Sequence, residues 1–330
     1  MNINDAGDAK FAAEIKALVQ KSPRILITGH ERPDGDCIGS EVGLCSTLRA
    51  AGFNASIVNA DPVPTRYEFL NVDGMIRVGS PDETFEADLL FVLDATDLRR
   101  LGKLKRENFK VADVIDIDHH LDNPNFGKIN WVETHASSTG ELIFRLAKAA
   151  GWKIPPIGLK ALYAAVVTDT GQFSYSNTSA RVLNIAAEMI EQGVSPEEMW
   201  KRIYLNKSAA ELALESRARA SMELRAGGQI CSIGLRYSDF TETGTNSQHT
   251  EEFAGIPRSV EGVKLALFMY EIDEGRATKV SVRTMHGADA NKLARVFGGG
   301  GHRQAAGCTL PFKLDEAKAK VFAEAEKLLQ

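Results

Sequence analysis

The chain has 330 residues, of which 44% are hydrophobic and 25% are charged, and its formal net charge is -5. These values are typical of a globular protein with room for two domains that each bury a core. The acidic balance argues against a broad basic surface that binds long duplex nucleic acid. It leaves short or small anionic substrates open, because a basic pocket can lie within an acidic total.

The cysteines and the apolar runs indicate the compartment. Four cysteines lie far apart without paired spacing, which argues against a zinc ribbon or a disulfide framework and fits a reducing cytosol. The first residues lack the basic-then-apolar pattern of a signal peptide, and no run approaches roughly 18 apolar residues. We therefore expect a cytoplasmic protein that does not span a membrane.

The first half of the chain alternates apolar runs with amphipathic segments. Strands are predicted over residues 24–30, 54–61, 87–97 and 112–120, and helices over residues 38–52, 138–151 and 159–169. Continuous apolar strands separated by helices indicate a mostly parallel sheet, flanked by helices and covered on both faces. The fold class is α/β, and we assign this first domain to residues 1–194.

A change of pattern marks the second half. Residues 195–226 are rich in helix formers, and Ser195-Pro196-Glu197 is a helix start, so a connecting helix or helix pair is predicted. Further strands are expected over residues 229–240, 262–273 and 276–285. Residues 227–330 are therefore predicted to form a smaller α+β domain.

Acidic and imidazole side chains follow several of the predicted strands. They are His30, Asp34 and Asp36 after the first strand, Asp94 after the third, and Asp118, His119 and His120 after the fourth. A further aspartate, Asp169, ends the apolar segment 159–169. In open parallel sheets, ligands bind beyond the carboxyl ends of the strands, so we expect these side chains to converge there. Gly35 and Gly39 are interpreted as bends in a loop that carries the first three.

Converging carboxylates would require cations between them. Two carboxylates about 4 Å apart repel by roughly 4 kcal/mol at an effective dielectric of about 20. Histidine and aspartate together suit Mn²⁺, Zn²⁺ or Fe²⁺ better than an all-oxygen calcium or magnesium cage. Six ligands, four of them anionic, are enough for two divalent ions with one bridging carboxylate.

Each piece of this site also has a plainer interpretation. The D-G-D sequence alone is typical of a solvated turn, Asp94 alone could cap a turn, and two adjacent histidines could lie on a surface. The spacing from Asp34 to Gly39 resembles a calcium loop, but the twelfth position, where an EF-hand carries an acid, is Cys45. These interpretations would have to hold at every strand end at once. Cys37, inside the first motif, is interpreted as a packing residue.

Four consecutive glycines, Gly298, Gly299, Gly300 and Gly301, precede His302. Glycine disfavours helix and strand interiors, so this run favours close backbone approach to a ligand. A P-loop would continue with Lys-Ser/Thr, and a dinucleotide fingerprint would follow a strand, whereas residues 291–297 look helical. An anion-binding loop is preferred over a flexible linker. In the strand at residues 276–285, Arg283 is predicted to point away from Val280 and Val282, where it could contact phosphate or simply lie on the surface.

Together, five motifs resemble those of the DHH phosphoesterase superfamily with a DHH-associated domain of the first type. They are GHERPDGDCIGS, VLDATD, IDIDHHLDN, VVTDTGQF and GGGGHRQAAG, in this order along nearly the whole chain. The compact two-domain size is similar to the NrnA-like group, the nanoRNases that also dephosphorylate 3′-phosphoadenosine 5′-phosphate. RecJ exonucleases share the motifs but are longer, and manganese pyrophosphatases lack the GGGGH motif.

The resemblance implies a role for each matching residue. His30 and Asp34 would bind one Mn²⁺, while Asp36, His119 and Asp169 would bind the other, with Asp94 bridging the two. His120 would lie near the substrate phosphate, and Asp118 would orient a neighbouring histidine. The four glycines, His302 and Arg283 would hold a terminal phosphate or nucleotide across a cleft between the domains.

One departure from the family pattern concerns the segment after DTGQF. Many relatives carry an arginine where this chain has Ser174, so one phosphate contact is absent or comes from elsewhere. Arg303, Arg99 or Arg100 could supply it. This departure bears on substrate length rather than on the metal centre.

The function expected from the resemblance is Mn²⁺-dependent hydrolysis of very short RNA to 5′-mononucleotides, with possible dephosphorylation of 3′-phosphoadenosine 5′-phosphate. Two ions about 3.5–4 Å apart would generate a hydroxide nucleophile and clamp the attacking and leaving oxygens. Mg²⁺, Co²⁺ and Fe²⁺ are alternatives to Mn²⁺, and a homodimer is left open. The alternative function is a phosphodiesterase for c-di-AMP or pApA. A RecJ-like single-strand exonuclease and a non-catalytic nucleotide-binding protein rank lower.

Overall fold

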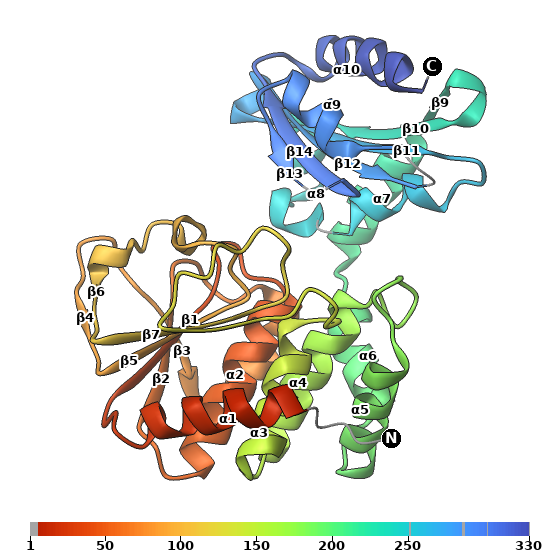
Figure 1. Cartoon of the computed structure of the whole chain (residues 1–330). Helices are drawn as coiled ribbons and strands as arrows, with labels where there is room; N and C mark the ends of the chain where they lie inside the picture. Colours follow the sequence, from red (N-terminus) through yellow and green to blue (C-terminus); the bar gives the residue numbers. More distant parts are fainter. Residues whose placement is uncertain (1–5, 251, 286–287, 302, 330) are drawn as a thin grey trace. The chain divides into compact units, whose positions relative to one another are not determined.

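The computed structural model describes residues 6–250, 252–285, 288–301 and 303–329. The chain divides into two compact units, Met1–Asn206 and Lys207–Gln330 (Figure 1). Within the described ranges, no helix is both long enough and apolar enough to cross a bilayer. Each unit has its own sheet and its own core, so each is described by itself.

The first unit is built on a six-stranded sheet with the order β3-β2-β1-β5-β7-β8. Its strands are β1 (Ile25–Thr28), β2 (Ala55–Asn59), β3 (Ile76–Val78), β5 (Leu89–Leu93), β7 (Asp113–Asp118) and β8 (Ile129–Val132). All neighbouring strands pair in parallel, which confirms the predicted parallel sheet. β3 and β8 were not predicted, and β3 is only three residues long with two of them exposed.

Different elements cover the two faces of this sheet. Helices of the first unit are α1 (Ala6–Val19), α2 (Gly35–Ala50), α3 (Thr139–Ala150), α4 (Pro156–Asp169), α5 (Ala180–Glu191) and α6 (Pro196–Tyr204). The main core joins these helices to one face, through residues such as Ile27 and Phe91. The other face, which includes Leu90 and Val92, packs under short 3₁₀ turns and a small parallel pair, β4 (Phe85–Glu86) and β6 (Phe109–Lys110). Both faces are therefore covered, but the α-helices lie on one of them.

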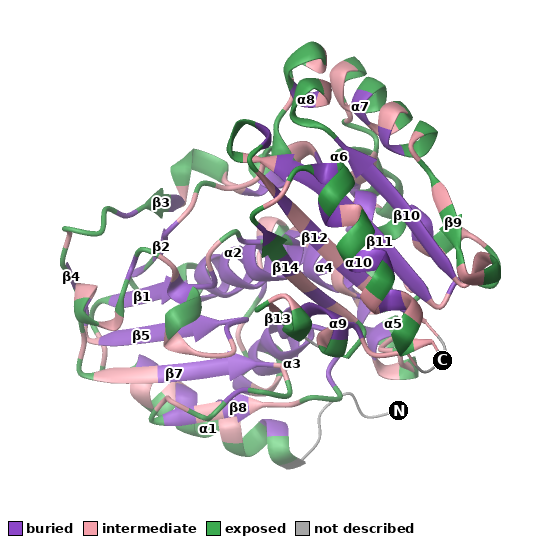
Figure 2. Cartoon of the chain, turned by 90° about the horizontal axis from the view of Figure 1, so that it is seen from above, coloured by how far each residue is buried: buried purple, intermediate pink, exposed green. Residues whose placement is uncertain are grey.

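Helix α2 is buried along nearly all of its length and packs closely on α4 (Figure 2). Three glycines at intervals of four residues, Gly35, Gly39 and Gly43, face α4. A Cβ atom added at Gly39 would lie 2.4 Å from the carbonyl oxygen of Ala161 and 2.9 Å from the backbone nitrogen of Ala165. The absence of side chains on this stripe lets the two helix backbones approach each other. The glycines that the sequence suggested as loop bends are thus helix-packing residues.

A buried ion pair attaches α1 to the rest of the first unit. The Arg145 guanidinium on α3, 2% exposed, donates to Asp8 from Nε at 3.0 Å and from Nη2 at 2.5 Å. Its Nη2 atom also lies 2.9 Å from Oε2 of Glu133. A buried charge is stable only when it is paired. The contact between Asp8 and Arg145 therefore holds α1 against α3.

Asp8→Asn is expected to lower the free energy of unfolding by about 2 kcal/mol, because the buried guanidinium loses its two-point contact with Asp8 and keeps only Glu133 at 2.9 Å and Glu141 at 3.5 Å. Urea unfolding followed by circular dichroism measures this. Asp113→Asn is the matched control, since Asp113 pairs with Lys128 at 2.8 Å on the surface, and it should cost much less. Equal losses in the two variants would contradict the importance of the buried pair.

The second unit contains a mixed six-stranded sheet with the order β13-β14-β12-β11-β10-β9. Its strands are β9 (Glu223–Arg225), β10 (Ile230–Leu235), β11 (Leu265–Ile272), β12 (Ala277–Thr284), β13 (Gly300–Gly301) and β14 (Ala305–Leu310). Its helices are α7 (Ala209–Ala220), α8 (Tyr237–Thr243), α9 (Ala290–Val296) and α10 (Leu314–Leu328). Among the strands described in this unit, β10 and β11 alone pair in parallel, and the other pairs are antiparallel. The predicted α+β architecture is confirmed.

The stretch 195–226, expected as a helical linker, contains α6 and α7 followed by β9. Ser195 caps α6, accepting a hydrogen bond from the backbone N–H of Glu198, and Pro196 is the first helical residue, as predicted. The division between the two units lies between Asn206 and Lys207, between the two helices. Helix α6 contacts elements of the first unit and α7 contacts elements of the second.

Candidate metal centre

The predicted site lies where the strand order of the first sheet reverses. Beyond β1 the chain adds β2 and β3 on one side, and it then returns to add β5, β7 and β8 on the other. Where the connections that follow two adjacent strands lead to opposite sides of the sheet, a crevice forms at the carboxyl ends of these strands. His30 and Asp94 follow the two strands at this reversal, β1 and β5, and His119 follows β7 beside them. The topology therefore places these side chains at one edge.

The first motif begins a helix, whereas a loop was predicted from the sequence. Asp34 is the N-cap of α2, and its Oδ1 accepts from the backbone N–H of Asp36 at 3.0 Å and of Cys37 at 3.1 Å. A side-chain acceptor at this position satisfies N–H groups that have no intrahelical partner. Asp36 consequently lies in the first helical turn and is 2% exposed. The expectation of a loop bent at Gly35 and Gly39 is wrong, because both residues are helical.

Asp94 lies between two imidazole rings. Its Oδ2 is 3.5 Å from Nε2 of His30, and its Oδ1 is 3.6 Å from Nε2 of His119. The residue directly after β5 has φ of +56°, a left-handed conformation that aspartate tolerates better than most residues. Its backbone N–H donates to the carbonyl of Ile117 at 3.1 Å, which holds the turn against β7.

His119 lies close to carboxylates at the ends of two helices, α2 and α4. Its Nε2 lies 3.6 Å from Oδ2 of Asp36 on α2 and 3.8 Å from Oδ2 of Asp169, the last residue of α4. The Nε2 atom of His30 lies 3.8 Å from Oδ1 of Asp34. The six predicted metal ligands are therefore all linked by distances below 4 Å. They are His30, Asp34, Asp36, Asp94, His119 and Asp169.

The N-terminus of α3 supports two of these carboxylates, which was not predicted from the sequence. The backbone N–H groups of Thr139 and Gly140 donate to Asp36 at 2.7 and 2.9 Å. The Thr139 hydroxyl donates to Oδ1 of Asp94 at 3.1 Å. Free N–H groups at a helix start favour anions, so the start of α3 orients the two carboxylates and favours negative charge there. The Ser-Thr-Gly-Glu sequence, whose Ser138 caps the helix, was the available signal.

Asp118 is fully buried at the end of β7 and organises the two histidines. Its Oδ1 accepts from the backbone N–H of His119 at 2.8 Å and contacts Nδ1 of His120 at 2.7 Å. Its Oδ2 accepts from the amide of Asn123 at 2.8 Å, a partner that the sequence analysis did not identify. Burial opposes both charges, but the pairing holds the pKa of Asp118 at about 2 and raises the pKa of His120 to about 9. His120 is therefore held as a cation beside Asp94, 3.8 Å from its Oδ1.

The electrostatics of the cluster fit divalent cations. Burial and the neighbouring carboxylates of Asp94 and Asp169 raise the pKa of Asp36 well above its ordinary value. Burial likewise raises the pKa of Asp169 to about 7, against the opposing effect of His119. Metal ions between the carboxylates would remove this cost of ionisation. The mixed nitrogen and oxygen donors are those that first-row divalent metals accept.

Three overlapping groups of side chains bring their donor atoms within 4.8 Å of one another. They are Asp36 with His119 and Asp169, Asp94 with His119 and His120, and His30 with Cys37 and Asp94. Each is a place where these residues could hold a metal ion. Cys37 is fully buried, and burial keeps the pKa of its thiol well above the usual value, so the thiol is neutral.

The glycine run in the second unit is held by its own sheet. A Cβ atom at Gly299 would lie 2.2 Å from the carbonyl oxygen of Gly307, and one at Gly301 would lie 2.6 Å from that of Ala305. Gly298 has φ of +72°, and Gly300 pairs with Gly307 in the two-residue strand β13. Part of the expected close approach is therefore to β14. His302 lies outside the described residues.

The arginines assigned to the substrate occupy different settings. Arg283 is half-buried on β12 and alternates with the buried Val280 and Val282, as predicted. Arg99 is 91% exposed, and its Nη2 lies 2.8 Å from Oδ2 of Asp97. Ser174 is exposed, and its hydroxyl donates to the carbonyl of Gly171.

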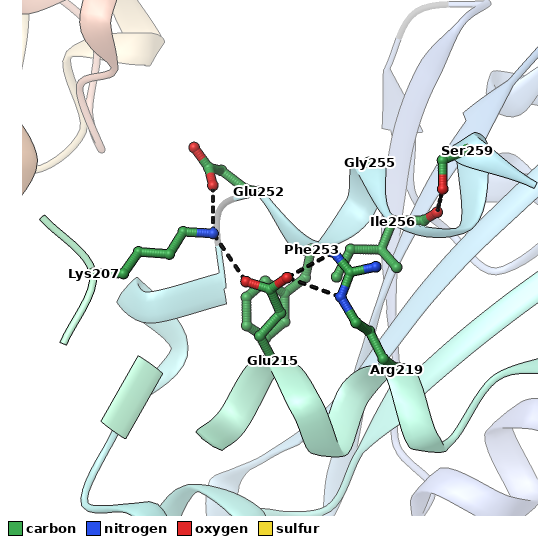
Figure 3. Close-up of a pocket in the computed structure, with 8 residues that line it drawn as sticks. All are labelled: Lys207, Glu215, Arg219, Glu252, Phe253, Gly255, Ile256 and Ser259. Atoms are coloured by element: carbon green, nitrogen blue, oxygen red, sulfur yellow. Dashed lines mark hydrogen bonds and ion pairs between the residues drawn. The ribbon is translucent and has the colours of Figure 1, made fainter. Parts of the chain in front are cut away.

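A separate pocket of about 230 Å³ lies in the second unit (Figure 3). Its charges are paired within it, since Glu215 accepts from Lys207 at 2.9 Å and from Arg219 at 2.7 Å. Its lining includes none of the described residues that were predicted for the site. The pocket is thus not part of the cluster at the strand ends.

Comparison with known proteins connects this geometry to a family. Residues 24–166 match the DHH family, N-terminal domain, and residues 230–330 match the DHHA1 domain. The bifunctional oligoribonuclease and PAP phosphatase NrnA of Thermus thermophilus is 32% identical, covering 94% of this chain and 91% of that protein. The cyclic-di-AMP phosphodiesterase PdeA of Listeria monocytogenes is 24% identical over 96% of this chain and 48% of that protein. The crystal structure of an exopolyphosphatase-related protein from Bacteroides fragilis matches with a TM-score of 0.89, at 26% identity and over 96% of both chains.

Proposed function

Because this chain belongs to the DHH family, we propose that it is a metal-dependent hydrolase of very short RNA that releases 5′-mononucleotides and also dephosphorylates 3′-phosphoadenosine 5′-phosphate. The observation that carries the proposal is the convergence of six acidic and imidazole ligands at the strand reversal. The full-length similarity to NrnA, in both domains, supports the substrate class.

The proposed ligands divide into two sets. His30 and Asp34 would hold one ion, and Asp36, His119 and Asp169 would hold the other, with Asp94 shared between them. When bound, divalent cations activate a water and stabilise the charge on the phosphoryl oxygens. The mixture of imidazole and carboxylate donors supports Mn²⁺, with Mg²⁺, Co²⁺ and Fe²⁺ as alternatives.

The chain's own groups would position the phosphate and supply charge. His120 is assigned to the substrate phosphate, because Asp118 orients its ring through Nδ1 at 2.7 Å and holds it beside the proposed metal ligand Asp94. A cationic imidazole stabilises negative charge that develops on a phosphate oxygen. Asp118 acts on the reaction through this histidine, and Asn123 in turn fixes Asp118.

Further substrate contacts are assigned to residues outside the cluster. Arg283, Gly298 to Gly301 and His302 would hold a terminal phosphate or nucleotide, and Arg99 would contribute from the first unit. The half-buried position of Arg283 on the polar face of β12 supports this, because a partly desolvated guanidinium binds phosphate strongly.

A second candidate function is hydrolysis of c-di-AMP or its linear product pApA. The observation that favours it is the similarity to PdeA over 96% of this chain. Both functions need the same metal centre, and they differ in which phosphodiester fits beside it. A direct comparison of substrates therefore separates them.

Turnover by metal-stripped protein, assayed before and after addition of Mn²⁺, is the test. The stripped protein should be inactive, and Mn²⁺ should restore cleavage of pApA, a five-nucleotide RNA and 3′-phosphoadenosine 5′-phosphate, with little cleavage of a 24-nucleotide strand. Preference for c-di-AMP would transfer the assignment to the second candidate. Equal turnover with chelator present would contradict the metal centre, and silence on all substrates with Mn²⁺ bound would contradict the substrate class.

A further inference from the structure

A short basic loop follows the metal centre in the first unit. Residues 97–106, DLRRLGKLKR, contain five arginines and lysines and a single acid, in a chain whose net charge is -5. The loop begins three residues after Asp94, at the carboxyl end of β5, and includes the 3₁₀ turn η3 (Leu98–Leu101). The basic loop therefore starts at the sheet edge that carries the metal ligands and runs from there toward β6 (Phe109–Lys110).

The backbone of this loop packs against the loop that carries His30. The N–H of Glu31 donates to the carbonyl of Arg100 at 2.6 Å. Gly102 has φ of +65°, and a Cβ atom there would lie 2.7 Å from the Cβ of Glu31. Only glycine permits this conformation and this approach without strain. The basic loop is thus fixed beside the first metal motif.

Apolar residues anchor the loop while its charges point outward. Leu101 and Leu104 are 1% and 0% exposed and belong to the core on the second face of the sheet. Arg100, Lys103 and Lys105 are exposed between and beside them. A buried anchor fixes the backbone of the loop, so an anion can bind these cations without the entropy cost of ordering a mobile loop.

The charges of the loop are not equally available. Arg99 is bound by Asp97, and the guanidinium of Arg106 donates to the carbonyl of Phe109. Arg100, Lys103 and Lys105 form no ion pair within the part of the chain that the structure describes. These three residues, rather than Arg99, carry the uncompensated charge.

We propose that Arg100, Lys103 and Lys105 form an anion-binding rim that holds the phosphodiester backbone of a short single strand beyond the phosphate at the metal centre. The inference rests on the proposed function and adds to it the part of the chain that recognises the second and later phosphates. Lysine and arginine contacts to phosphate give affinity without sequence preference and weaken with salt. The rim would therefore favour oligonucleotides over substrates with one phosphate, at any base sequence.

The test compares Arg100→Gln/Lys103→Gln/Lys105→Gln with Lys21→Gln/Lys153→Gln, whose exposed lysines lie before β1 and after α3, near the amino ends of the strands. Binding of a 3′-labelled five-nucleotide RNA is measured by fluorescence anisotropy, with Asp94→Asn added to each protein so that turnover does not interfere. The rim variant should bind about 10- to 100-fold more weakly, and the slope of log affinity against log salt should fall by about 2. The control pair should change neither quantity.

Kinetics without the Asp94 change complete the test. Hydrolysis of the p-nitrophenyl ester of thymidine 5′-phosphate, which has one phosphate, should be unchanged in the rim variant, whereas KM for the RNA should rise. Equal loss on both substrates, or unaltered RNA binding, would overturn the proposal. If the wild-type protein binds RNA through the rim but does not cleave it, the proposed function fails and the rim stands.

Discussion

Asp94→Asn is expected to reduce phosphodiester hydrolysis by about 10³-fold while leaving the fold intact. Asp94 is the proposed shared ligand, with one oxygen 3.5 Å from His30 and the other 3.6 Å from His119. An amide of the same shape lacks the charge needed to hold two cations together. Asparagine also tolerates the left-handed backbone at this position, where φ is +56°, so backbone strain is not added. The loss can then be attributed to the metal centre.

Metal content measured by atomic emission adds a second readout. The wild-type protein should retain two Mn²⁺ ions per chain after dialysis, and the variant should retain fewer. Asp113→Asn is the control, because Asp113 begins β7 at the opposite edge of the sheet from His119. It should leave both activity and metal content unchanged. Turnover by Asp94→Asn near the wild-type rate would show that the assignment of a shared aspartate is wrong.

The strand ends made much of the candidate site predictable. Apolar runs such as Leu89–Leu93 have the composition of buried parallel strands, and Asp94 follows this one directly, while His30 comes two residues after β1. Strand order could not be read from the residues, yet it mattered little, because all carboxyl ends of a parallel sheet face one edge. The position of His30, Asp94 and His119 followed from this rule alone.

Contacts made by backbone groups were not predictable in the same way. The N–H groups of Thr139 and Gly140 donate to Asp36, which lies more than 100 residues away in the sequence. The side chains of these two residues give no sign of this backbone contact. Asn123 supports Asp118 through an amide that is equally suited to a turn. Such partners depend on how helices pack on the sheet, which single-residue chemistry does not determine.

The role of a glycine was hard to predict, because one residue type answers several physical needs. Gly35 and Gly39 were interpreted as bends, but they lie inside α2, where the absence of a side chain allows α4 to pack closely. Gly299 and Gly301 were interpreted as approaching a ligand, and their nearest neighbours are atoms of β14. In both cases a partner backbone that is distant in sequence sets the requirement.

Gly39→Ala is expected to lower the free energy of unfolding by about 3 kcal/mol and to reduce activity strongly. The new methyl would lie 2.4 Å from the Ala161 carbonyl oxygen and 2.9 Å from the Ala165 nitrogen, and these backbone atoms can move only if α4 moves. Because α2 carries Asp36 and α4 ends at Asp169, separating the helices would pull two ligands of one proposed ion apart. Urea unfolding and Mn²⁺ affinity measure the two effects.

Gly43→Ala is the control that separates the displacement of the α4 backbone from the general cost of adding a methyl group to a packed interface. Its methyl would meet Leu162, with Cδ2 at 2.4 Å and Cγ at 2.6 Å, so a side chain rather than the backbone of α4 has to give way. The helix propensity gained on replacing glycine, about 1 kcal/mol, acts equally in both variants. Gly43→Ala should therefore be much more stable than Gly39→Ala and should keep its Mn²⁺ affinity. If the two variants lose stability and metal affinity alike, close backbone contact between α2 and α4 does not position the centre.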